Sequence, residues 1–315
     1  MALNFISISE EVRSALATGH AVVALETTLV AHGFPGPEGL AVALESERQV
    51  RGAGAVPATV GVLSGQVVVG LSATQLERFA GASTAAKVGP REVASCVASG
   101  ELGATTVGGT LAVCAAVGIQ FMGTGGIGGV HRGFAQSLDI SADLHQIART
   151  AAVVVASGPK SLLDVDATAE MLETLGVPVL GWRTPSLPRF YTAQGGPPVS
   201  AMVEDADQVA AIADLHWRLA GRAGLVLGQS PPRDLDVDAL LAEALSATAA
   251  QGVKGQAVTP AVLAYLHDAS NGETVSLNKE LIAANARLAG EVAAAHARLL
   301  SARREENAPQ DNPRL

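Results

Sequence analysis

Short apolar runs, many of them β-branched, alternate along most of the chain with stretches whose apolar residues recur at helical spacing. This alternation predicts strands followed by helices, as in an α/β layered domain. Ser64 and Gly65 form a two-residue turn signal between two of the runs and predict an antiparallel hairpin, so the sheet should be mixed and mostly parallel. The expected strands are 22–25, 57–63, 66–69, 119–122, 153–156, 177–180 and 225–227.

Capping residues mark the start of several helices. Ser9 precedes an amphipathic stretch, and Pro37 stands at a first-turn position before residues 38–50. Ser72 and Gln75 have the spacing of a capping box. These signals place helices between the expected strands.

The character of the chain changes after residue 230. Helical stretches follow at 236–250, 260–269 and 276–305, with no strong strand among them and no Ser/Gly-rich linker before them. We therefore expect a single α/β/α layered domain over residues 1–305, with a central mixed, mostly parallel β-sheet and a helical C-terminal region. The polar, proline-punctuated residues 306–315 are expected to form a disordered tail.

Composition narrows the classes of function. Lys and Arg number 21 against 30 Asp and Glu, a net charge of −9 over 315 residues. This balance argues against a nucleic-acid partner, which clustered cations would attract, but it allows the phosphate of a small metabolite. The N-terminus lacks a basic start followed by an apolar stretch, and no apolar run reaches the ~18 residues of a membrane helix. Cys96 and Cys114 have no partner at metal-ligand spacing, so we expect buried thiols in a soluble cytoplasmic protein with no membrane association.

Glu26 ends the apolar run at 22–25 and precedes a loop that contains His32. A carboxyl group at the end of a buried strand retains its proton unless it is paired, because an unpaired buried charge is costly. Glu26 is therefore a candidate general acid, and a salt-bridged or helix-capping glutamate is the alternative. His32 is expected to line the same cleft.

The most distinctive segment is residues 121–144. Four glycines within residues 125–129 follow an apolar strand, and His131 and Arg132 come directly after them. Such a loop offers free backbone N–H groups to an anion. The loop has neither the dinucleotide fingerprint in its full context nor the Walker pattern, which disfavours a nucleotide-binding function.

Asp139 and Asp143 are four residues apart, so a helix over 138–149 would place both on one face, with Ser141 near its first turn. Two carboxylates beside a Gly-rich loop suit a hard cation such as Mg²⁺ or Mn²⁺ better than zinc. The alternative is that Asp139 caps the helix and Asp143 complements its dipole.

Three further polar residues stand out from apolar or small surroundings. Lys160 lies between the strand at 153–156 and a predicted helix at 161–175, where the helix dipole disfavours the ammonium and favours a nucleophilic amine. Phosphate binding by a charged Lys160 is the alternative. Lys87 suits phosphate or sugar hydroxyls, or simple exposure to solvent. Asn285, on an Ala- and Leu-rich helix, offers a donor and an acceptor to a base edge, or lies on the surface.

Several long motifs, in the same order and spacing, resemble the pseudouridine-5'-phosphate glycosidase family from about residue 7 to 300. They include ALETTLVAHGFPGPEG, GAVPATVGVLSGQVVVGL, GATTVGGT, TGGIGGVHRG, DISADL, ASGPKSLLDVDATAEMLETLGVPVLGW and NARLA. The resemblance implies a reversible reaction in which pseudouridine 5'-phosphate and water give uracil and ribose 5-phosphate. It also implies one divalent cation per subunit, usually Mn²⁺, and a homotrimer with sites near the subunit boundaries.

The bond broken in that reaction joins two carbons, so the usual scheme of two carboxylates around a leaving oxygen does not transfer. The family chemistry instead resembles imine formation: the ribose ring opens, a lysine amine bonds to the anomeric carbon, and uracil leaves protonated on carbon. Water then releases the sugar phosphate.

The resemblance also implies roles by position. Lys160 matches the nucleophile, Glu26 the proton donor and Asp139 the metal ligand. Lys87, Val107, Ser141, Ala142 and Asp143 match substrate-binding positions. The same pattern places Thr106, Thr124 and His131 around the ribose phosphate and base, and Asn285 at uracil.

The chain departs from the family pattern at one place. It reads KVGPRE where relatives often have Lys-Val-Ser-Arg-Arg, so Gly89 and Pro90 replace a hydroxyl and a guanidinium that help to hold phosphate, while Arg91 is retained. Two outcomes are open: phosphate affinity weakens while uracil recognition persists, or Arg132 or a neighbouring subunit compensates. Two rivals to the leading function remain: another Schiff-base sugar-phosphate isomerase or aldolase, and a non-catalytic accessory protein.

Overall fold

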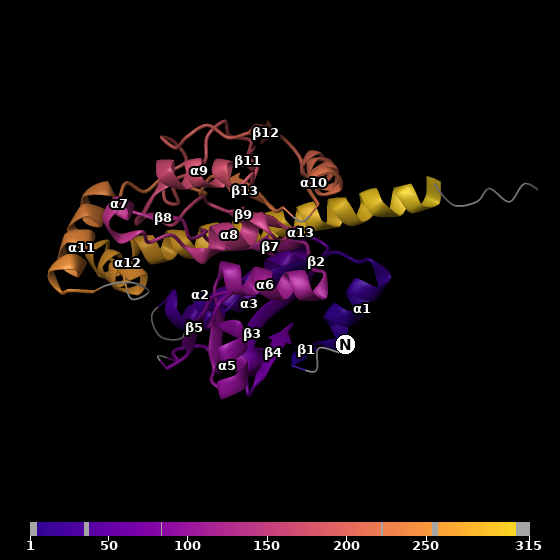
Figure 1. Ribbon diagram of the computed structural model, residues 1–315, viewed down its shortest axis with the longest axis horizontal. Coiled ribbons are helices and arrows are strands. Elements are labelled where there is room, and N and C mark those ends of the chain that lie inside the picture. Colours follow the sequence, from indigo (N-terminus) through magenta and orange to yellow (C-terminus); the bar gives the residue numbers. More distant parts are fainter. Residues whose placement is uncertain (1–4, 35–37, 83, 222, 254–257, 307–315) are drawn as a thin grey trace, which may run out of the picture.

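The computed structural model describes residues 5–34, 38–82, 84–221, 223–253 and 258–306 (Figure 1). Within these ranges the strands are β1 (Ile6–Ile8), β2 (Val22–Glu26), β3 (Val56–Leu63), β4 (Gln66–Val69), β5 (Ala86–Val88), β6 (Gly103–Thr105), β7 (Phe121–Gly123), β8 (Val130–His131), β9 (Val153–Ala156), β10 (Leu163–Asp164), β11 (Val179–Trp182), β12 (Ala201–Val203) and β13 (Leu225–Gln229). The helices are α1 (Glu10–Thr18), α2 (Thr28–His32), α3 (Glu38–Gly52), α4 (Ala73–Glu77), α5 (Val93–Ser99), α6 (Val107–Val117), α7 (Phe134–Ser137), α8 (Ala142–Ala148), α9 (Val165–Thr174), α10 (Ala206–Ala220), α11 (Asp238–Ala250), α12 (Val258–Ala269) and α13 (Glu273–Glu306).

The main sheet is mixed and mostly parallel, as predicted. Its strands follow the order β1-β4-β3-β2-β7-β9-β13-β11-β12, and β6 joins β3 to β5 beside this path. Among these described strands the antiparallel pairs are β3 with β4 and β3 with β6. The β3–β4 hairpin turns at Ser64 and Gly65, which both have positive φ (51° and 76°), as a type I′ turn requires.

Every strand predicted from an apolar run is confirmed, with ends that differ by one or two residues. The strands that the pattern missed are β1, β5, β6, β8, β10 and β12, each of two or three residues. A segment of that length is too short to show an alternating pattern, because strand periodicity needs at least four residues to be recognised.

Alternate residues of the central strands enter two different apolar clusters, so the sheet is covered on both faces. Val22 and Ala24 of β2 join one cluster with residues of α1, α5, α6, α8 and α9. Val23 and Leu25 join the other with residues of α3, α10 and α13. The result is the three-layered α/β/α arrangement that was predicted, and the long α13 runs across the molecule in Figure 1.

The helical C-terminal region is confirmed, and it folds back onto the sheet. Helix α13 packs against α3, α10 and strands β2, β7 and β9. Its close approach depends on Gly123 in β7, where a Cβ atom would lie 3.0 Å from the Cα of Ala286. The predicted tail at 306–315 begins with Glu306, the last residue of α13, and otherwise lies outside the described residues.

The predicted helix starts are confirmed at Ser9, which caps α1, and at Ser72 and Gln75, which form the capping box of α4. Helix α3 begins at Glu38, and Pro37 before it lies outside the described residues. Cys96 and Cys114 are buried free thiols, and burial raises the pKa of Cys114 to about 12. Among the described helices, none combines the length and the apolar character that a membrane span requires.

Candidate active site

A cavity of about 380 Å³ opens at the carboxyl ends of β2 and β9, two strands on either side of β7 in the parallel part of the sheet. This is the edge where open α/β sheets bind ligands. Its lining contains the predicted residues Glu26, His32, Lys87, Thr106, His131, Asp139, Ser141, Ala142, Asp143 and Lys160. The chain therefore brings together residues as far apart in the sequence as Glu26 and Lys160, most of them polar.

Glu26 ends β2 and is only 3% exposed. Its Oε1 accepts a hydrogen bond of 2.5 Å from the hydroxyl of Thr124, and its buried Oε2 has no hydrogen-bond partner among the described residues. Burial raises the pKa of Glu26, and this effect outweighs the lowering by the Lys160 charge and by the Thr124 hydrogen bond. A carboxyl group in this state holds a proton that it can donate.

Thr124 and Asn285 lie behind Glu26 and not on the cavity lining. Asn285 is fully buried in α13, and its Nδ2 donates to the backbone oxygen of Thr124 (2.8 Å) and to Oγ of Ser157 (3.1 Å). The amide thus fixes the loop after β7, and the Thr124 side chain then holds Glu26. Asn285 is not part of the cavity lining, and its amino group is used by the protein, whereas its buried Oδ1 has no hydrogen-bond partner among the described residues. The expected contact of Asn285 with a bound base stays a prediction.

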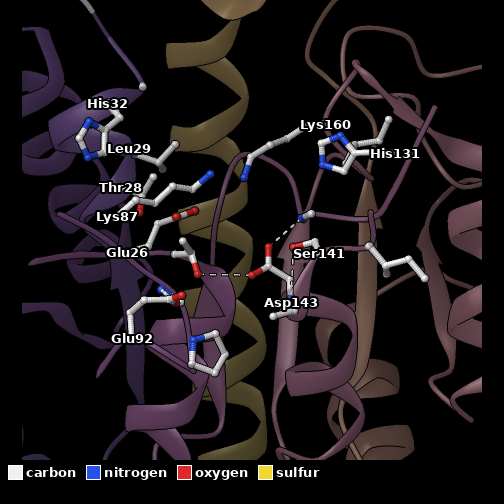
Figure 2. A pocket seen from close by; sticks show the side chains of 18 of the residues that line it. Glu26, Thr28, Leu29, His32, Lys87, Glu92, His131, Ser141, Asp143 and Lys160 are labelled. Atoms are coloured by element: carbon white, nitrogen blue, oxygen red, sulfur yellow. Dashed lines mark hydrogen bonds between the residues drawn. The ribbon is translucent and has the colours of Figure 1, made fainter. Parts of the chain in front are cut away.

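Lys87 from β5 and Lys160 from the loop after β9 extend into the cavity from opposite walls, with their amines toward each other above Glu26 (Figure 2). Burial lowers the pKa of Lys87, and the charge of Lys160 lowers it further, against the raising effects of Asp143, Glu26 and Asp139. Two amines and a carboxyl group therefore share one poorly hydrated space.

The helix predicted at 161–175 begins later than expected, so Lys160 does not lie at a helix N-terminus. Leu163 and Asp164 pair with Val130 and His131 as β10 and β8, which keeps the chain extended after Lys160. Asp164 then caps α9 by accepting from the N–H of Ala167 at 3.0 Å. The surroundings of Lys160 are set by the facing cavity wall instead of by a helix dipole.

Asp143 is 4% exposed, and both of its oxygens are occupied by backbone donors. Oδ1 accepts from the N–H of Gly108 at 2.7 Å, and Oδ2 accepts from the N–H of Gly128 at 2.9 Å. The hydroxyl of Thr106, which also caps α6, lies 3.4 Å from Oδ1. Asp143 therefore ties the Gly-rich loop to the start of α6. The neighbouring Val107 has its side chain in the core.

Asp139 and Asp143 do not share a helix face, contrary to the prediction for 138–149. Leu138 adopts a left-handed conformation (φ 54°) that ends α7, and Ser141 caps α8, which begins only at Ala142. Asp139 therefore lies in the loop between the two helices. Its side chain is 41% exposed, and its Oδ2 is 4.0 Å from Nδ1 of His131.

The residues present fit a cation that is held through one protein carboxylate. Both oxygens of Asp143 already accept backbone hydrogen bonds, whereas Asp139 is a partly exposed carboxylate on the cavity lining. Mg²⁺ and Mn²⁺ accept such sites, since they keep several water or substrate ligands. No group of three or more His, Cys, Asp or Glu in the described ranges could enclose a metal ion.

The cavity also contains residues that the sequence patterns did not single out. Leu29, Ile140, Leu163 and Leu263 give it apolar walls, and Glu92 adds a carboxylate. Thr28 and Leu29 come two and three residues after Glu26, so their place could have been inferred from the strand end. Leu263 comes from α12, and no local signal connects it with the site.

Known proteins resemble this chain over almost its whole length. The family model described as indigoidine synthase A like protein matches residues 11–295. A protein named pseudouridine-5'-phosphate glycosidase from Herpetosiphon aurantiacus is 44% identical, over 91% of this chain and 97% of its own. One of the same name from Salinispora tropica is 47% identical, over 91% of this chain and 90% of its own.

Solved structures show the same agreement. The prealnumycin C-glycosynthase in complex with ribulose 5-phosphate superposes with a TM-score of 0.87 at 40% identity, over 95% of this chain and 99% of that one. An indigoidine synthase A-like protein from Thermotoga maritima gives a TM-score of 0.84 at 35% identity, over 93% of this chain and 97% of that one.

Proposed function

Since the chain belongs to the indigoidine synthase A-like family, we propose that it cleaves the carbon–carbon glycosidic bond of pseudouridine 5'-phosphate reversibly, giving uracil and ribose 5-phosphate. The relatives of that name cover nearly the whole chain at 44% and 47% identity, in agreement with the resemblance seen in the motifs. The observation that carries the proposal is that the Lys160 amine and the buried carboxyl group of Glu26 meet in one cavity.

Lys160 is the proposed nucleophile. Its nitrogen bonds to the anomeric carbon of the ribose as the ring oxygen leaves and takes up a proton. The nitrogen lone pair then forms the imine as the bond to the uracil carbon breaks, and the electron pair of that bond is protonated on the base. Water adds to the imine and releases ribose 5-phosphate and the free amine, so the protein ends unchanged.

Glu26 is the proposed proton donor for the departing base. Its raised pKa keeps it protonated before the bond breaks, and the Thr124 hydroxyl fixes one oxygen so that the other is available to the substrate. A carboxyl group that is kept neutral by burial can act as a general acid near neutral pH.

The other lining residues are proposed to hold the substrate. Lys87, Thr106 and His131 present polar groups to the sugar and phosphate, as does the segment 141–143 at the start of α8. Val107, Thr124 and Asn285 act from behind the lining. A divalent cation, Mn²⁺ in our proposal, would be held by Asp139 and would supply positive charge to a phosphate or sugar oxygen.

The activity is tested by incubating the protein with pseudouridine 5'-phosphate and Mn²⁺ and following uracil release. Lys160→Ala should abolish release, and borohydride with ribose 5-phosphate should add the mass of the sugar phosphate to the wild type but not to the variant. Turnover of another sugar phosphate without uracil release would favour the isomerase or aldolase alternative. Absence of both turnover and borohydride labelling would favour an accessory protein.

A second candidate function is the formation of a carbon–carbon bond between ribose 5-phosphate and an aromatic compound other than uracil. The similarity to a C-glycosynthase at 40% identity favours it, and the apolar walls at Leu29, Leu163 and Leu263 would accept such a ring. Supplying ribose 5-phosphate with uracil in one reaction and with a larger aromatic acceptor in another distinguishes the two candidates. We further propose a cytoplasmic homotrimer, whose subunit count light scattering would measure.

A further inference from the structure

The cavity wall at residues 89–92 already holds an anion that belongs to the protein. Oε2 of Glu92 accepts a hydrogen bond of 3.1 Å from the backbone N–H of Gly89, and Oε1 accepts one of 2.7 Å from Nε of Arg91. A backbone N–H and a guanidinium are the groups with which proteins bind phosphate. Here both are occupied by a carboxylate that lines the cavity and is 27% exposed.

Gly89 is what makes room for that carboxylate. A Cβ atom at residue 89 would lie 2.9 Å from Oε2 of Glu92, closer than real Cβ contacts allow. A residue other than glycine at 89 would therefore require the end of the Glu92 side chain to shift, which disturbs its hydrogen bond to the backbone N–H. Pro90, which follows, has no N–H to offer to a ligand. Gly89, Pro90 and Glu92 thus form a matched set that reduces the anion-binding capacity of this wall.

The charged groups that line the cavity around Glu92 also affect the binding of an anion. Figure 2 shows Glu92 on the wall that also carries Glu26 and Lys87. Glu92 pairs with Arg91, and the same lining carries Asp139 and Asp143 as well as the cations Lys87 and Lys160. A cavity of about 380 Å³ is comparable in width to one Debye length at physiological salt, ~8 Å, so salt screens a charge on Glu92 only in part from a ligand in the cavity.

We infer that Glu92 is a specificity-determining residue, which weakens binding of the substrate's phosphate and so reduces the preference of the enzyme for a phosphorylated over an unphosphorylated C-nucleoside. This inference rests on the proposed function for the reaction itself, but the contacts that carry it are independent of the reaction. Glu92 acts on the ligand through its charge, and Gly89 acts only by leaving space for Glu92.

The test compares kcat/KM for pseudouridine 5'-phosphate with kcat/KM for pseudouridine. Glu92→Gln keeps the shape and removes the charge, so the ratio of the two constants should rise at least tenfold, which corresponds to about 1.4 kcal/mol. Gly89→Ala should raise the ratio in the same direction. The effect of the double variant should be smaller than the sum of the two single effects, because both changes act on one contact. Glu77→Gln, an exposed glutamate of α4 away from the cavity, should leave the ratio unchanged.

Binding of ribose 5-phosphate and of ribose, measured by calorimetry, keeps the inference testable whether or not uracil is released. Tighter binding of ribose 5-phosphate by Glu92→Gln, with ribose unchanged, supports it even if the proposed reaction fails. Equal ratios in wild type and Glu92→Gln, together with equal ribose 5-phosphate affinity, overturn it even if the wild type releases uracil rapidly.

Discussion

Replacing Asn285 by alanine should show whether this residue positions the general acid Glu26 or contacts the bound base. The change removes the two short hydrogen bonds that its amide donates to the Thr124 oxygen and to the Ser157 hydroxyl. Both acceptors are buried, and no water can replace the amide unless the site opens. The loop that carries Thr124 then loses its anchor, and Glu26 loses a fixed partner.

The expected loss of stability follows from the number of acceptors left without a donor. Each buried acceptor that loses its partner costs about 1–3 kcal/mol, so two of them should lower the free energy of unfolding by about 2–6 kcal/mol. For a chain of this size, that corresponds to a fall in Tm of about 4–12 °C, taking about 2 °C per kcal/mol. Urea unfolding and thermal melts would measure these two quantities.

The activity assay distinguishes the two roles of Asn285. A positioning role predicts that kcat for uracil release falls, that its pH profile shifts because the Thr124 hydrogen bond to Glu26 loosens, and that KM for uracil in the synthetic direction stays constant. Asn278→Ala, which removes a buried amide from the same helix seven residues away, should cost stability without changing the pH profile. A tenfold rise in KM for uracil at unchanged kcat and unchanged stability would refute the reasoning. It would indicate that Asn285 contacts the bound base instead.

Two further predictions concern the carboxylates of the cavity. Because burial raises the pKa of Glu26 above its ordinary 4.5, the proton of this group stabilises the fold fully below pH 4.5, and that contribution is lost as the pH rises through the folded-state pKa. Glu26→Gln should therefore abolish uracil release. In urea titrations, the variant should gain stability relative to the wild type as the pH rises from 4 to 8. A difference in unfolding free energy between the two proteins that does not change with pH would argue against a buried protonated acid. Asp139→Ala should raise the Mn²⁺ concentration for half-maximal activity at least tenfold, which corresponds to about 1.4 kcal/mol. The free energy of unfolding should change little, since the Asp139 side chain is 41% exposed. An unaltered metal titration would exclude Asp139 as the ligand.

The parts of the fold that could be predicted from sequence are those with a repeated local pattern. The run at β3 has eight residues and the run at β9 has four, both are almost wholly buried, and they were recognised as strands. The start of α8 was placed four residues too early because an uninterrupted helix was assumed from Leu138, although Ser141 is a typical cap. The start of α9 was also placed too early, because Asp164 gives a cap signal only once the β10–β8 pairing is known.

Some residues of the candidate site likewise carry a local sequence signal, and others do not. Glu26 and Lys160 could be found because each follows a recognisable strand, and the carboxyl ends of parallel neighbours meet at one edge. Asn285 and Thr124 are 161 residues apart, and only the packing of α13 on β7 brings them together. The contact of Glu92 with the Gly89 N–H depends on the exact path of the backbone after β5, which residue types alone do not determine.

A general acid and an amine in one cavity pose a chemical problem, because a carboxyl group next to an amine ordinarily transfers its proton and leaves an ion pair. Burial works against that transfer in this cavity. It raises the pKa of Glu26 and lowers the pKa of Lys87, so both changes favour the uncharged forms. Imine chemistry assisted by an acid requires a neutral acid to persist beside an amine. The apolar walls contributed by Leu163 and by Leu263 of α12 favour the same uncharged forms, because they limit the water that can solvate a charge in the cavity.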